Sequence, residues 1–145
     1  MAESLVARVP VPVDRQVRAS VREAYLARVR SVGLAEEKYV ADRLERVVLR
    51  LRKSAGWLTQ LAECATALSA VYFDEPEADS RLTQEGRRHI LAALYYLCSP
   101  RDVIPDFDPG LGYVDDALVL NRCVATLRSR WPALHRTAVT LAERP

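Results

Sequence analysis

The sequence predicts an all-α domain, a compact bundle of five to six helices with a Pro/Asp-rich connector between the last long helices. Half of its 145 residues are hydrophobic, which is enough to form one core. Glycine occurs only five times, and the apolar side chains recur at helical spacing. We expect an extended N-terminal arm over residues 1–13 and a single helical domain over residues 14–145.

The first two helical patterns occupy the N-terminal half of the chain. The first helix is expected to begin after Asp14, whose side chain suits an N-cap, and to end just before Gly33. A second pattern starts near Leu34 and continues through Val71. That length is unusual for one helix in a small domain, so we predict a break around residues 54–56.

Three further helices follow an acidic, proline-containing linker at residues 73–84. The first is expected from about Leu82 to Cys98, with a broad apolar face. A second pattern covers residues 115–131, and Pro132 suits the first position of a last short helix.

The cysteine content and the apolar runs favour a cytoplasmic protein. Cys64, Cys98 and Cys123 lie in apolar helical stretches, and an odd count without paired spacing predicts buried reduced thiols. No apolar run approaches the roughly 18 residues that a membrane-spanning helix needs. The first 15 residues lack the continuous apolar core of a secretion signal. Attachment to the inner membrane surface, without crossing it, is the alternative.

Charge is distributed unevenly along the chain. The formal net charge is +2, but residues 1–53 and 117–145 are basic while residues 54–116 are acidic. The acidic middle can attract the basic flanks within the fold, or a basic surface can face an anionic partner. The sequence leaves both interpretations open.

Residues 99–116, SPRDVIPDFDPGLGYVDD, combine three prolines and five aspartates with large apolar side chains. Pro100 and Pro105 disfavour helix at the residues before them, and residues 108–111 suit a type II turn. Asp115 suits the cap of the helix that follows. We predict a rigid, partly buried connector, and connectors of this length without regular structure are often functional.

The segment LAALYYLCSPRDVIPDFDPGLGYVDDALVL, residues 91–120, resembles the signature of the YkvA-like family of small bacterial proteins. That family has no known function, and its pattern is approximately sPxDlIPDfxpxlGylDD, here within residues 82–128. The resemblance implies a helical fold and no established reaction. Asp108 stands where the family commonly has an apolar residue. The matching structural positions are Pro100, Ile104, Pro105, Phe107, Gly112 and Tyr113.

The aspartates of this segment are candidate ligands for Mg²⁺ or another divalent cation, because hard cations prefer oxygen ligands. Their spacing is not that of an EF-hand loop. In the alternative interpretation they cap helices and pair with arginines such as Arg87, Arg88 and Arg101, and the protein holds no cofactor. The four candidate ligands are Asp102, Asp106, Asp115 and Asp116.

Other catalytic patterns are missing from the sequence. His89 and His135 have no cysteine or carboxylate neighbours at zinc-ligand spacing. GxSxG, P-loop and GxGxxG motifs are absent.

The segment RLERVVLRLRK, residues 43–53, predicts a basic amphipathic helix. Such a helix can bind an acidic protein, an anionic lipid surface or phosphates, or it can be an ordinary solvated face. Nucleic acid is the less favoured partner, because no helix-turn-helix or exposed aromatic pattern accompanies the charge. One helical stripe holds Arg43, Arg46, Arg50 and Lys53.

These observations favour a non-enzymatic cytoplasmic interaction or regulatory module that resembles the YkvA-like family. The partner is expected to be another protein or a second copy of the chain, because the apolar helix faces exceed what a small monomer easily buries. One alternative is a metal-dependent hydrolase that uses the aspartate cluster. A further alternative is a peripheral membrane protein that binds through the basic helix.

Overall fold

The structure, a computed structural model, describes residues 13–54, 56–74, 80–99 and 113–143. The described residues form six α-helices and one short π-helix, without a strand, which confirms the all-α prediction. The elements are α1 (Arg15–Ser31), α2 (Leu34–Lys53), α3 (Trp57–Ser69), η2 (Ala70–Asp74), α4 (Ser80–Cys98), α5 (Val114–Arg130) and α6 (Pro132–Ala142).

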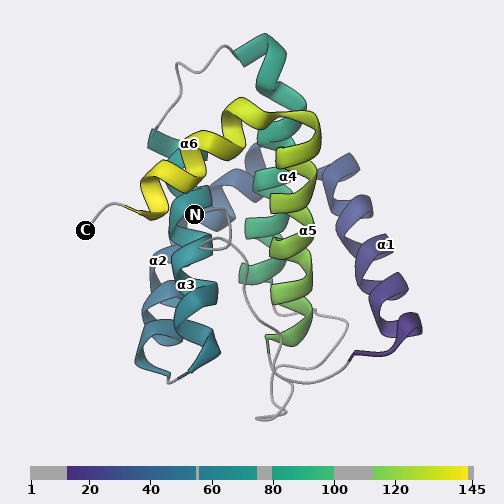
Figure 1. Cartoon of the computed structure of the whole chain (residues 1–145), viewed down its shortest axis with the longest axis vertical. Helices are drawn as coiled ribbons and strands as arrows, with labels where there is room; N and C mark the ends of the chain where they lie inside the picture. Colours follow the sequence, from purple (N-terminus) through teal and green to yellow (C-terminus); the bar gives the residue numbers. More distant parts are fainter. Residues whose placement is uncertain (1–12, 55, 75–79, 100–112, 144–145) are drawn as a thin grey trace.

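Helix α4 lies at the centre of the bundle (Figure 1). It packs against α1, α2, α3, α5 and η2, while α6 crosses near one end of α5. The sequence predicts a broad apolar face for this helix. Instead, the five consecutive residues Ile90–Leu94 are all buried, as expected for a helix surrounded by others.

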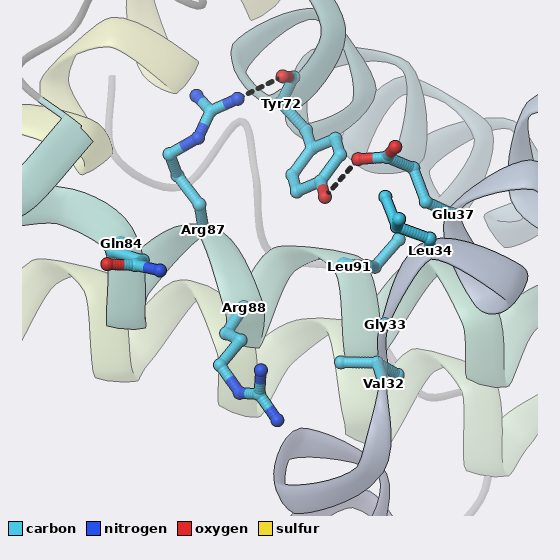
Figure 2. A pocket seen from close by; sticks show the side chains of 9 residues that line it. All are labelled: Val32, Gly33, Leu34, Glu37, Tyr72, Gln84, Arg87, Arg88 and Leu91. Atoms are coloured by element: carbon cyan, nitrogen blue, oxygen red, sulfur yellow. Dashed lines mark hydrogen bonds between the residues drawn. The ribbon is translucent and has the colours of Figure 1, made fainter.

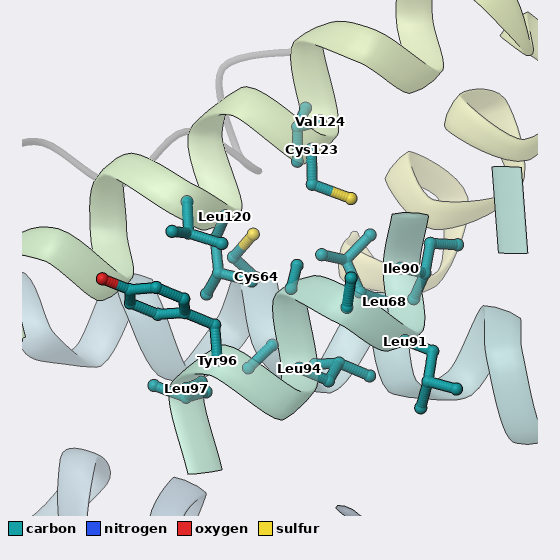
Figure 3. Close-up of a cluster of buried hydrophobic side chains, with 14 of the residues drawn as sticks. Cys64, Leu68, Ile90, Leu91, Leu94, Tyr96, Leu97, Leu120, Cys123 and Val124 are labelled. Atoms are coloured by element: carbon teal, nitrogen blue, oxygen red, sulfur yellow. The ribbon is translucent and has the colours of Figure 1, made fainter. Parts of the chain in front are cut away.

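The core forms where α3, α4 and α5 meet (Figure 3). Leu68, Leu94 and Leu120 are completely buried there. Cys64, Cys98 and Cys123 are buried free thiols, as predicted. Burial raises the pKa of the Cys98 and Cys123 thiols to about 12, so they remain protonated and unreactive at neutral pH.

The first helix boundaries follow from local chemistry. The Val17 N–H donates to Asp14 Oδ1 at 2.9 Å, so Asp14 is the N-cap of α1 as predicted. Gly33 lies just beyond α1 as expected, but it adopts extended backbone with φ −153° and is the N-cap of α2. Its N–H donates to Glu36 Oε1 at 2.7 Å, which fixes the turn between the two helices.

Two further breaks between helices were predictable. Helix α2 ends at Lys53, and Gly56 has φ +79°, a left-handed conformation that glycine adopts without strain. The long pattern therefore divides where the sequence predicts. Pro132 occupies the first position of α6, as expected for a residue with no N–H to donate.

The start of α5 differs from the prediction. Asp115 is not the N-cap: α5 begins at Val114, two residues earlier than a cap at Asp115 implies, and Tyr113 is the N-cap. Tyr113 has φ +71°, and a non-glycine residue in this left-handed region carries a strain of about 1–2 kcal/mol. Because the chain turns at Tyr113, both Asp115 and Asp116 fall in the first turn of the helix rather than before it.

Within the described residues, no helix has both the length and the apolar character that crossing a membrane requires.

Candidate functional site

Two adjacent carboxylates lie inside the protein at the start of α5. Asp115 and Asp116 are both completely buried. The Tyr96 hydroxyl of α4 donates to Asp115 Oδ2 at 3.0 Å, and the Asp116 N–H donates to Asp115 Oδ1 at 3.1 Å. Acidic groups in the first turn also favour the positive end of the helix dipole. We call Tyr96, Asp115 and Asp116 the polar centre.

Arginines of α1 and α2 each lie over a tyrosine ring, and the one on α1 lies over a ring of the polar centre. The Arg28 guanidinium of α1 lies 4.7 Å from the centre of the Tyr96 ring. On α2, Arg43 lies 3.8 Å from the centre of the Tyr39 ring, and the Tyr39 hydroxyl donates to the Cys98 carbonyl at 3.4 Å. Cation–π contacts of this kind are worth about 0.5–2 kcal/mol. The Arg28–Tyr96 contact joins α1 to α4, whereas the Arg43–Tyr39 contact lies within α2.

Residues 100–112 of the predicted connector lie outside the described residues. Of the four candidate metal ligands, the structure therefore describes Asp115 and Asp116. The other residues singled out in the connector are Pro100, Asp102, Ile104, Pro105, Asp106, Phe107, Asp108 and Gly112. Of the structural signature positions, Tyr113 alone is described, and it makes the left-handed turn before α5.

The described part of the chain contains no group of three or more histidine, cysteine, aspartate or glutamate side chains that could hold a metal ion. Asp115 and Asp116 form a pair, which is one ligand fewer than such a group. In the described residues, the Asp115 carboxylate joins α5 to α4 through the hydrogen bond that Tyr96 donates.

The predicted basic stripe is a surface feature of α2. Arg46, Arg50 and Lys53 are exposed, whereas Arg43 is half-buried against Tyr39. None of the three exposed cations forms an ion pair with a described residue. The neighbouring Arg52, by contrast, lies 3.7 Å from Glu63. We call Arg43, Arg46, Arg50 and Lys53 the basic face.

A cavity of about 400 Å³, which no pattern in the sequence predicts, lies beside the turn between α1 and α2 (Figure 2). Residues 32–34 of the turn, Glu37 of α2, Tyr72 of η2 and one side of α4 line it. The Tyr72 hydroxyl donates to Glu37 Oε1 at 2.6 Å. Burial and this hydrogen bond raise the pKa of Tyr72, while Arg87 and Arg88 act in the opposite direction. We call this space the α1–α2 cavity.

A buried tyrosine–histidine pair was also missed. Tyr25 of α1 and His89 of α4 share a hydrogen bond of 2.9 Å between Oη and Nδ1. Burial, followed by the nearby Cys123, raises the pKa of Tyr25, and burial lowers the pKa of His89. Tyr25 occupies an apolar position of the helical pattern in α1, which indicates burial but cannot identify a partner on another helix.

One comparison with known families finds a match. The family model described as "Protein of unknown function (DUF1232)" matches residues 88–121, about a quarter of the chain. The matched range includes Tyr96, Asp115 and Asp116, so it contains the polar centre. No curated protein and no solved structure matches the chain. The match provides a domain similarity but no activity, and a function must be argued from the geometry.

Proposed function

We propose that this chain is a non-enzymatic interaction module that binds an acidic protein partner through the basic face of α2. The observation that carries the proposal is the exposure of Arg46, Arg50 and Lys53, which have no ion-pair partner among the described residues. Cations without an internal partner are available to carboxylates of another protein. The finer similarity to the YkvA-like family, and a location in the cytoplasm, are part of the same proposal.

The shape of the basic face suits a helical partner. Arg43 and Lys53 are ten residues apart, so the stripe extends about 15 Å along α2. Steps of three and four residues keep the four side chains on one side of the helix. An acidic helix with glutamates at the same steps would place a carboxylate opposite each cation, as pairs of charged side chains do between coiled-coil helices.

The polar centre supports a binding role over the hydrolase alternative. Asp115 and Asp116 are completely buried, and Asp115 accepts hydrogen bonds from the Tyr96 hydroxyl and the Asp116 N–H. A hydrolytic centre needs its reacting groups within hydrogen-bond reach of a substrate. Carboxylates engaged between α4 and α5 stabilise the fold that presents α2.

The test compares two charge-reversal variants of the purified protein. Arg46→Glu/Arg50→Glu alters the basic face, and Arg15→Glu/Arg22→Glu makes the same charge change at exposed positions of α1. The probe is a fluorescent, glutamate-rich helical peptide, measured by anisotropy at two salt concentrations. We expect binding by the wild type and the α1 variant, at least about tenfold weaker binding by the α2 variant, and weaker binding at high salt.

If both variants lost the same amount of peptide affinity, the proposal would be overturned, because binding would then depend on net charge rather than on the basic face. Preferred binding to vesicles of anionic lipid or to single-stranded DNA would also overturn it. Sedimentation of the unliganded protein adds a further check. A stable dimer that the α2 variant disrupts would mean that the basic face contacts a second copy instead of an acidic partner.

A further inference from the structure

The α1–α2 cavity has the size of a small-molecule site. Its volume of about 400 Å³ lies within the range of natural ligand pockets, and a cavity of about 150 Å³ already holds benzene. It therefore has room for an aromatic ring with a short side chain. Val32, Leu34 and Leu91 provide its apolar surface. Leu34 is 80% exposed, more than any other large apolar side chain in the described residues, and is available for contact with a ligand.

The polar groups around the cavity favour an anion. Two guanidinium groups, from Arg87 and Arg88, line it together with one carboxylate, from Glu37. The Tyr72 hydroxyl already donates to that carboxylate. The lining thus carries an excess positive charge. Glu37 is engaged with Tyr72, and Arg87 donates to the Val71 and Tyr72 carbonyls, so Arg88 is the cation of interest for a ligand.

Arg88 is held in place before any ligand arrives. Its Nε donates to the Val29 carbonyl and its Nη2 to the Arg30 carbonyl, both at 2.9 Å. Its Nη1 makes no hydrogen bond to a described residue. A guanidinium fixed at one edge loses little conformational entropy when it binds an acceptor at another edge, and charged hydrogen bonds are the stronger kind.

We propose that the α1–α2 cavity binds a small organic monocarboxylate with a compact apolar body. The carboxylate accepts hydrogen bonds from Arg88, and the apolar body lies against Leu34 and Leu91. This inference is independent of the basic face, because none of the cavity residues belongs to that stripe.

The experiment uses 3-phenylpropionate as the probe and 3-phenylpropanol as its uncharged counterpart. Binding is measured by saturation-transfer NMR and by calorimetry. We expect saturable binding of the acid and at least about tenfold weaker binding of the alcohol, because the alcohol cannot form the charged hydrogen bond.

Two matched variants locate the site. Leu34→Asp and Leu49→Asp both place a carboxylate at an exposed leucine of α2, but only Leu34 lines the cavity. The first variant should weaken binding of the acid at least about tenfold, through repulsion and lost apolar contact, and the second should leave it unchanged. Leu34 is exposed, so folding is preserved, and melting curves check this. The proposal would be overturned if the acid did not bind saturably or if the acid and the alcohol bound with equal affinity. It would also be overturned if both variants lost the same amount of affinity for the acid.

Discussion

At the scale of single residues, the most consequential contact is the one between Tyr96 and Asp115. A buried carboxylate is costly unless hydrogen-bond donors surround it. Tyr96 provides one such donor from the neighbouring helix, and it contacts the Arg28 guanidinium through its ring face. One side chain therefore links α1, α4 and α5. Its hydroxyl and its ring have separate roles, which substitution can distinguish.

Tyr96→Phe should lower the free energy of unfolding by about 2 kcal/mol, because a buried carboxylate loses a donor while the ring stays. The matched control is Tyr95→Phe, since Tyr95 is half-buried and contacts the edge of the Tyr39 ring. We expect the control to change stability by no more than about 0.5 kcal/mol. Urea denaturation of both variants measures the difference, and equal losses would contradict a specific role for the Tyr96 hydroxyl.

At the scale of elements, α4 is the helix around which the others are arranged (Figure 1). Its neighbours approach closely where its side chains are small. Gly86 is the clearest case: a Cβ there would lie 2.6 Å from Leu134 Cδ1 and about 3 Å from the Trp131 ring. The absence of a side chain at Gly86 leaves room beside α4 for Trp131 and for Leu134 of α6.

Gly86→Ala should destabilise the protein by up to about 2 kcal/mol. Alanine gains up to about 1 kcal/mol of helix propensity over glycine, but overpacking a filled interface costs about 1–3 kcal/mol and exceeds this gain. Leu134→Val removes the Cδ1 atom that the new Cβ would meet. The double variant should therefore lose less stability than the sum of the two single variants. Additive losses, measured by denaturation, would show that the contact with Leu134 is not the cause.

Much of this arrangement of elements was predictable, and the reasons for the exceptions are physical. Asp14, Gly56 and Pro132 mark helix boundaries through local backbone chemistry, so the sequence reveals them. The π-helix η2 has no comparable marker, because an apolar pattern of helical period does not show where one turn widens. The α1–α2 cavity and the Tyr25–His89 pair depend on residues brought together from distant helices. The periodic pattern of apolar residues in a sequence shows which face of a helix is buried, but it cannot show which distant residues contact that face.

At the scale of the whole molecule, stability should depend on pH through two buried histidines. Burial lowers the pKa of His89, and the Arg130 charge adds to this effect. Burial also lowers the pKa of His135, with contributions from Arg128 and Arg136. The unfolded chain, with histidine pKa values near 6.5, then binds more protons than the folded chain. The stability contributed by the neutral histidines is present above about pH 6.5 and is lost as the pH falls through the lowered folded values.

His135→Leu tests this linkage. The His135 Nε2 atom is buried without a hydrogen-bond partner among the described residues, so its removal should cost little at about pH 7.5. As the pH falls toward about 5, the variant should become more stable than the wild type, because leucine takes up no proton in the unfolded state. Denaturation midpoints across this pH range measure the difference. A difference between the two proteins that does not change with pH would contradict the prediction.

The paired arginines of α4 have a consequence for how the bundle opens. Arg88 holds carbonyls at the end of α1, and Arg87 donates to the Val71 and Tyr72 carbonyls of η2. Because the two arginines are adjacent, opening the turn of α4 that carries them would release the end of α1 and the carbonyls of η2 together. Amide hydrogens in the last turn of α1 and those in η2 should therefore exchange with solvent as one cooperative unit, although they lie far apart in the sequence.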